Sequence, residues 1–148
     1  MDRASRGVVV DFHHRGQEVH RGGTGESDSE LTGAIIGCGM KVHSKLGPGL
    51  LESVYEECLC HELARAGLNF RRQVESRIKY DDFCLASGLR LDLLVEESVI
   101  VEVKAVENLL AVHEAQLLTY LRITGKRLGL LLNFNVPHFR NGIRRKIL

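Results

Sequence analysis

The spacing of hydrophobic and polar residues changes along the chain, and these changes divide residues 29–148 into helices and strands. Apolar residues recur at helical spacing over 29–46, 50–66 and 111–124, so these segments are predicted to be helices. Alternating or continuous apolar runs predict strands at 70–80, 83–86, 89–95, 99–106 and 128–134. Strands mixed with helices in this order predict an α/β (α+β) fold in one domain.

The hairpin predicted for residues 89–106 carries the most informative charges. Asp92, Glu102 and Lys104 interrupt its apolar pattern, and Glu102 and Lys104 share a face because side chains alternate along a strand. A three-residue loop over 96–98 would pair Asp92 with Glu102, about 5 Å apart on one face. Two carboxylates held so closely favour a cation between them, and oxygen ligands suit Mg²⁺ or Mn²⁺. The alternative is three solvated charges on an edge hairpin.

These motifs, in this order, resemble a known nuclease family. Asp92 followed by Glu102-Val103-Lys104 resembles the Asp…Glu-x-Lys signature of the PD-(D/E)XK nuclease superfamily, with Leu91 where a proline often precedes the Asp. Gly49-Leu50-Leu51-Glu52-Ser53-Val54-Tyr55 resembles the motif that names the GxxExxY family within that superfamily. Val42-His43, Leu46-Gly47-Pro48-Gly49 and His113-Glu114-Ala115-Gln116 are similar to the same family, so the resemblance covers roughly residues 31–148. Gln116 and Tyr120 resemble the fourth motif of RecB-type members.

The resemblance implies a fold, an activity and a set of site residues. The implied fold is a restriction-endonuclease-like core, a central mixed sheet flanked by helices, preceded here by an extra helix. The implied activity is Mg²⁺- or Mn²⁺-dependent hydrolysis of phosphodiester bonds in nucleic acid, with DNA favoured. The implied metal ligands are Glu52, Asp92, Glu102 and the backbone carbonyl of Val103; Lys104 would complete the catalytic set, and Gln116 and Tyr120 would position substrate.

Two other interpretations remain open from the sequence. The chain could be a catalytically silent module of the same fold that binds nucleic acid or a protein partner. It could also hold a metal cluster or zinc through its cysteines, which are Cys38, Cys58, Cys60 and Cys84. None of them forms a Cys-x-x-Cys pair, so reduced and mostly buried thiols are favoured.

The composition constrains location and partners. No apolar run approaches the roughly 20 residues of a membrane span, and no signal peptide is visible, so a cytoplasmic protein without membrane contact is predicted. Residues 1–28 are expected to be a disordered leader and 29–148 the nuclease-like domain. Beyond the glycine-rich start, residues 31–148 carry 16 basic and 13 acidic groups, a net charge of +3, which permits nucleic-acid binding.

Two segments leave further alternatives. The first helix contains Gly33, Gly37 and Gly39, which are poor helix formers and predict close packing against a neighbour, including another subunit in a homo-oligomer. The basic segment 135–148 is expected to be either a phosphate-contacting tail or a solvated terminus.

Overall fold

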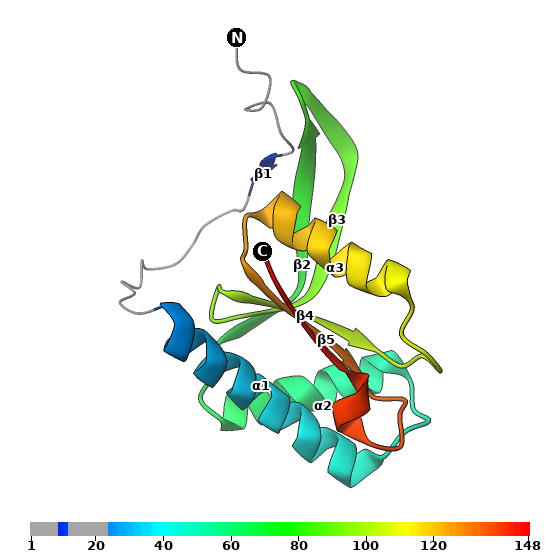
Figure 1. Cartoon of the computed structure of the whole chain (residues 1–148). Helices are drawn as coiled ribbons and strands as arrows, with labels where there is room; N and C mark the ends of the chain where they lie inside the picture. The colour runs from blue at the N-terminus through cyan, green and yellow to red at the C-terminus, as the bar shows by residue number, and fades with distance from the viewer. Residues whose placement is uncertain (1–8, 12–23) are drawn as a thin grey trace.

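Helices cover both faces of a single sheet in the computed structural model, which describes residues 9–11 and 24–148 (Figure 1). The described elements are β1 (Val9–Asp11), α1 (Thr24–Leu46), α2 (Glu52–Arg65), β2 (Phe70–Tyr80), β3 (Phe83–Val95), β4 (Val99–Lys104), α3 (Ala111–Thr124), β5 (Leu128–Asn133), the short 3-10 helix η2 (Phe139–Gly142) and β6 (Ile143–Ile147). No helix in this part of the chain is both long and apolar enough to cross a membrane.

The sheet is mixed, and its strand order follows the chain from β1 to β6. Every neighbouring pair is antiparallel except β4 and β5, which run parallel. The parallel pair arises because α3 connects the two strands and returns the chain to the end where β4 begins. The predicted class, a mixed sheet flanked by helices, is confirmed.

Two hydrophobic layers hold the helices to the sheet. Val101 and Val103 of β4 point to the face covered by α1 and α2, whereas Ile100 points to the face covered by α3. This division follows from the alternation of side chains along a strand. Polar residues at even positions near the end of β4 therefore lie on the α3 side of the sheet.

Leu91 and Leu93 do not share a face, although residues two apart on a regular strand would. Leu93 packs in the layer under α1 and α2, and Leu91 packs in the layer under α3. A distortion separates them, because Gln73 of the paired strand, which lies opposite Asp92, has a φ of 48°. The backbone of the β2–β3 ribbon therefore changes course beside Asp92.

One strand and the start of one helix lie inside the predicted leader. Val9–Asp11, inside the predicted leader, pairs antiparallel with β2, and α1 begins at Thr24 instead of residue 29. The rest of the predicted leader up to residue 23 lies outside the described residues, so the boundary between leader and domain stays a prediction.

β3 is one continuous strand, whereas two shorter strands were predicted at 83–86 and 89–95. It passes through Gly88, where a Cβ would lie 2.1 Å from the Ser76 carbonyl oxygen, so only glycine permits this close approach.

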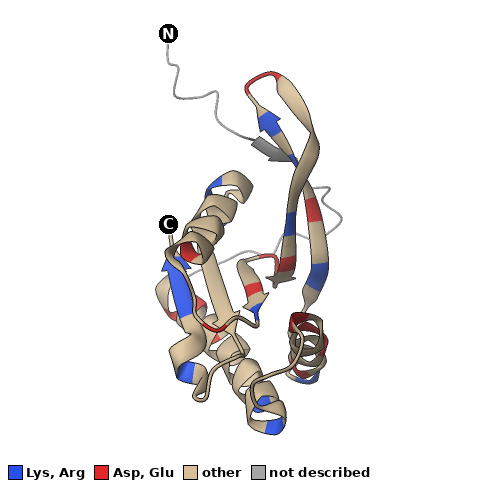
Figure 2. Ribbon diagram, turned by 90° about the vertical axis from the view of Figure 1, so that its right-hand side faces the viewer, with Lys and Arg blue, Asp and Glu red and all other residues tan. Residues whose placement is uncertain are grey.

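The basic C-terminal segment is part of the sheet. It was expected to be a tail or a solvated terminus, but η2 and β6 form there, and β6 pairs with β5 along its length. β5 is buried at all six positions, and β6 covers an edge that would otherwise expose unpaired backbone groups. β6 is itself an edge strand, and Arg144, Arg145 and Lys146 make it basic (Figure 2).

Candidate active site

The turn between β3 and β4 sets the register on which the site depends. Val95 pairs with Val99 and Leu93 pairs with Val101, so the loop has three residues, as the sequence predicts. One further step in this register places Asp92 opposite Glu102.

The loop has an unusual backbone that its neighbours stabilise. Glu96 and Glu97 have φ values of 52° and 53°, in the left-handed region that non-glycine residues seldom adopt. Glu96 exchanges hydrogen bonds with the backbone of Asn69 at 2.7 and 2.8 Å, and Arg71 donates two hydrogen bonds to the Glu97 carboxylate. These contacts, all formed with the start of β2 or the residue before it, fix the three-residue loop.

The carboxyl groups of Asp92 and Glu102 each accept a hydrogen bond from a backbone N–H of the other strand. The Asp92 backbone N–H donates to Glu102 Oε1 at 3.2 Å, and the Val103 N–H donates to Asp92 Oδ2 at 2.9 Å. Carboxyl oxygens thus accept hydrogen bonds from these two N–H groups, as backbone carbonyl oxygens do in the paired part of β3 and β4. Glu102 is only 5% exposed. The result is two carboxyl groups held together at the point where β3 and β4 separate.

The surroundings of Glu102 favour its protonated form. Burial, the charge of Asp92 and a hydrogen bond with the Asp92 side chain together raise the pKa of Glu102 from 4.5 to about 9. In the metal-free protein at neutral pH, Glu102 therefore holds a proton next to the Asp92 carboxylate. A divalent cation could replace that proton, because metal ligation requires the deprotonated carboxylate.

Glu52 approaches the same region from α2, of which it is the first residue. Burial raises the pKa of Glu52, the nearby Lys104 ammonium lowers it, and the Asp92 charge raises it. The Ala105 backbone N–H also donates a hydrogen bond to the Glu52 carboxylate. Glu52 thus lies within electrostatic range of Lys104 and Asp92, beside the residue that follows β4.

Tyr55 supports the loop that precedes Glu52. Its side chain is fully buried and stacks on Phe134 with ring centroids 4.8 Å apart. Its hydroxyl donates to the Gly47 carbonyl at 2.6 Å and accepts from the Leu50 N–H at 3.1 Å. Tyr55 is therefore a positioning residue, and its place one turn after Glu52 couples the shape of the loop to the start of α2.

Two asparagines at or just after the end of β5 hold the loop before Glu52 and the segment after β4, and these roles were not predicted from the sequence. Asn135 Oδ1 accepts from the Gly49 N–H at 3.0 Å, where Gly49 has a φ of 101°. Buried Asn133 exchanges hydrogen bonds with the backbone N–H and carbonyl of Val106 at 3.0 and 2.9 Å. The available signal was an amide side chain at the end of an otherwise apolar strand.

Residues of α3 complete the surroundings of the carboxyl groups. Gln116 Nε2 donates to the Tyr120 hydroxyl at 3.0 Å. Burial raises the pKa of Tyr120, and the charges of Glu102 and Asp92 raise it as well, whereas the Gln116 hydrogen bond lowers it. Tyr120 therefore lies within range of both carboxyl groups, and Gln116 contacts Tyr120. His113 has a structural role, because its Nδ1 accepts from the Leu110 N–H at the start of the helix.

The metal ligands expected from the sequence stay a prediction. In the described part of the chain, no three His, Cys, Asp or Glu side chains lie close enough together to hold a metal. Asp92 and Glu102 supply two adjacent oxygen donors, and Mg²⁺ can bind through one or two carboxylates while it keeps several waters. All four cysteines are free: Cys38 and Cys60 are buried, Cys58 is partly buried and Cys84 is exposed.

Comparison with known proteins gives one match. The family model of the PD-(D/E)XK nuclease superfamily matches residues 29–146, which include every residue of the candidate site. No curated protein and no solved structure matches the chain.

Replacing Tyr55 by Phe should loosen the loop before Glu52. The variant keeps the ring and its stacking but leaves the Gly47 carbonyl and the Leu50 N–H without their partner, which should cost about 1–3 kcal/mol. We expect a lower melting temperature and faster hydrogen exchange at the Leu50 amide. Tyr80→Phe is the matched control, because Tyr80 is 65% exposed at the β2–β3 turn. Equal effects of the two variants would contradict the positioning role.

Replacing Glu102 by Gln should change how stability depends on pH in the metal-free protein. Since Glu102 holds its proton up to about pH 9 when folded, and only to about pH 4.5 when unfolded, the wild type should lose stability across this window as pH rises. Glu102→Gln removes the titration, so it should be more stable than wild type by a few kcal/mol near pH 9. Denaturant unfolding in EDTA measures this difference. The control, exposed Glu107→Gln, should follow the wild type, and a wild-type stability that rises across the window would refute the prediction.

Proposed function

The chain belongs to the PD-(D/E)XK nuclease superfamily, and from this membership we propose that it is a divalent-metal-dependent nuclease acting on DNA. The observation that best supports the proposal is the pair Asp92 and Glu102, two carboxyl groups that the fold holds together, with Glu102 buried and Asp92 half-buried. Two charged carboxylates this close would repel each other, so Glu102 keeps its proton in the metal-free protein. A bound cation would replace that proton and stabilise both carboxylates.

Each site residue has a proposed role in phosphodiester hydrolysis. Asp92, Glu102 and the Val103 carbonyl would hold Mg²⁺ or Mn²⁺, with Glu52 binding directly or through water. When bound, the cation would lower the pKa of a water molecule and polarise the phosphate. The Lys104 ammonium, on the same face as Glu102, would orient the attacking water or the phosphate oxygens.

Substrate positioning is assigned to α3. Gln116 and Tyr120 are hydrogen bonded to each other, and Tyr120 lies within electrostatic range of Asp92 and Glu102. The pair could therefore hold a phosphate group over the carboxylates, which is the positioning role that raises the rate of an in-line reaction.

A finer family placement and a location form part of the proposal. Gly49, Glu52 and Tyr55 support membership in the GxxExxY family, and Gln116 with Tyr120 supports a RecB-like arrangement. The proposed location is the cytoplasm, where nucleic acid is present and thiols stay reduced. Free cysteines throughout the described chain suit that compartment.

The competing candidate is a silent module of the same fold that binds nucleic acid or a protein partner. It is favoured by the lack, in the part of the chain that the structure describes, of a three-residue metal-binding group. Calorimetry with Mn²⁺ distinguishes the candidates: heat that disappears in Asp92→Asn supports the nuclease, and no heat in the wild type supports the silent module.

Association through α1 is proposed as well. Gly33 and Gly37 have open space where a Cβ would lie, so this face of the helix could accept a second copy of the chain. Sedimentation of the wild type and of Gly37→Leu tests this. A dimer lost in the variant supports the interface, and a monomeric wild type rules it out.

Replacing Lys104 by Ala should abolish cleavage and leave metal binding intact. Because the ammonium would stabilise charge only during the reaction, we expect the rate to fall by about 100-fold or more. The assay is a panel of single- and double-stranded DNA and RNA with Mg²⁺ and Mn²⁺, and calorimetry reports Mn²⁺ binding.

The control for this variant is Lys41→Ala, which removes the same charge from an exposed position on α1. It should cleave at the wild-type rate. Cleavage by Lys104→Ala at that same rate would show that Lys104 has no catalytic role.

A further inference from the structure

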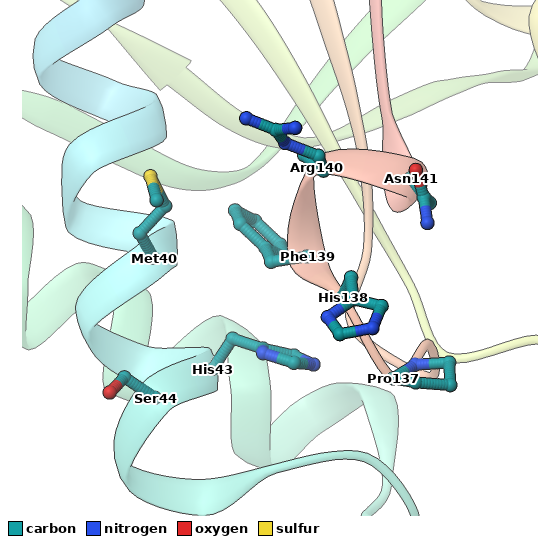
Figure 3. Close-up of a pocket in the computed structure, with 8 residues that line it drawn as sticks. All are labelled: Met40, His43, Ser44, Pro137, His138, Phe139, Arg140 and Asn141. Atoms are coloured by element: carbon teal, nitrogen blue, oxygen red, sulfur yellow. The ribbon is translucent and has the colours of Figure 1, made fainter.

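A pocket lies between α1 and η2, and none of the candidate active-site residues lines it. Its volume is about 710 Å³, and residues of α1 and of segment 137–141 line it (Figure 3). Small-molecule sites in proteins commonly have volumes of this order. The pocket therefore needs an explanation that the proposed nuclease site does not supply.

The polar side chains that line the pocket are donors, and none is acidic. They are His43, Ser44, His138, Arg140 and Asn141. His43 Nε2 lies 2.6 Å from the Val136 carbonyl oxygen, which can only accept, so this nitrogen carries a proton and the ring is fixed. Figure 3 shows the His43 ring pointing from α1 toward the segment that carries His138. A site rich in donors and free of carboxylates favours an anion.

Arg140 is among the Lys and Arg residues of the described chain that form no ion pair. Elsewhere in the described chain, seven Lys and Arg residues form ion pairs with Asp or Glu. The ion pairs of the described residues do not include Arg140, which is exposed at the pocket and could meet a ligand without first breaking a pair. A planar guanidinium binds phosphate oxygens through two parallel hydrogen bonds.

The pocket wall is fixed by close packing. Phe139 stacks on His43 at 5.5 Å, and a Cβ on Gly39 would lie 2.7 Å from the Phe139 ring. At the other end of η2, a Cβ on Gly142 would lie 2.1 Å from the Asn133 carbonyl oxygen. Gly39 and Gly142 thus let η2 lie tightly against α1 and β5, which fixes the backbone that carries Arg140 and Asn141.

We propose that the pocket between α1 and η2 binds a phosphate group. The Arg140 guanidinium makes the main contact. The phosphate can belong to a free nucleotide, to the end of a nucleic-acid strand or to its backbone. The inference goes beyond the proposed nuclease activity, because the pocket needs neither the metal nor Asp92 and Glu102.

Metal-free full-length protein in EDTA provides the test. Inorganic phosphate, adenosine 5′-monophosphate and a short oligonucleotide with either a 5′-phosphate or a 5′-hydroxyl are titrated, and NMR follows the imidazole signals of His43 and His138. We expect saturable shifts with phosphate and with at least one nucleotide probe. The probe that binds most tightly identifies the source: the monophosphate, the 5′-phosphorylated strand alone, or both strands equally.

Two single-residue variants distinguish a specific phosphate site from general electrostatic attraction of phosphate to basic residues. Arg140→Ala should weaken binding about tenfold with an unchanged melting temperature, whereas Arg145→Ala, which removes the same charge from exposed β6, should change it less than twofold. Equal weakening by the two variants, or no saturable shift with any probe, would overturn the proposal. Because binding is measured without metal, it can succeed or fail independently of the cleavage assay.

Discussion

The candidate site depends on one energetically costly contact, in which the carboxyl groups of Asp92 and Glu102 lie side by side where β3 and β4 separate. A three-residue turn fixes the register, and that register places Asp92 opposite Glu102. Each carboxylate then bonds a backbone N–H of the other strand, so neither side chain can move away without leaving a donor unpaired. The pKa of Glu102, raised to about 9, reflects the cost of keeping this group inside. Functional sites commonly hold residues in an energetically unfavourable state that the rigid structure around them maintains.

The loops around the carboxyl groups keep that frame rigid. Tyr55 holds the backbone before α2, Asn135 holds Gly49, and Asn133 holds the segment after β4. None of these three is acidic, and none needs to touch a substrate. Their hydrogen bonds instead fix the backbone next to Glu52 and Lys104, so that these residues of α2 and β4 lie in the same region.

The hairpin could be predicted from the sequence because its information is local. Turn length and alternation alone give the register of Asp92 and Glu102. β6 could not be predicted in this way, since its pairing with β5 depends on an edge that exists only after the sheet has formed. The same holds for Leu91, whose face changes because of a distortion at Gln73 in another strand. The catalytic roles of the site residues stay predictions, because chemistry cannot be inferred from packing.

The segment from Asn133 to Asn141 links the two sites that the molecule presents. Asn135 holds the loop before Glu52, and the next residue, Val136, accepts a hydrogen bond from His43 in the pocket between α1 and η2. Phe134 stacks on both Tyr55 and Phe139, with centroids 4.8 and 4.9 Å away. Packed aromatic rings and buried amides resist small displacements. The position of Glu52 and the shape of the pocket between α1 and η2 therefore depend on the same few contacts, so a change in this segment should affect both.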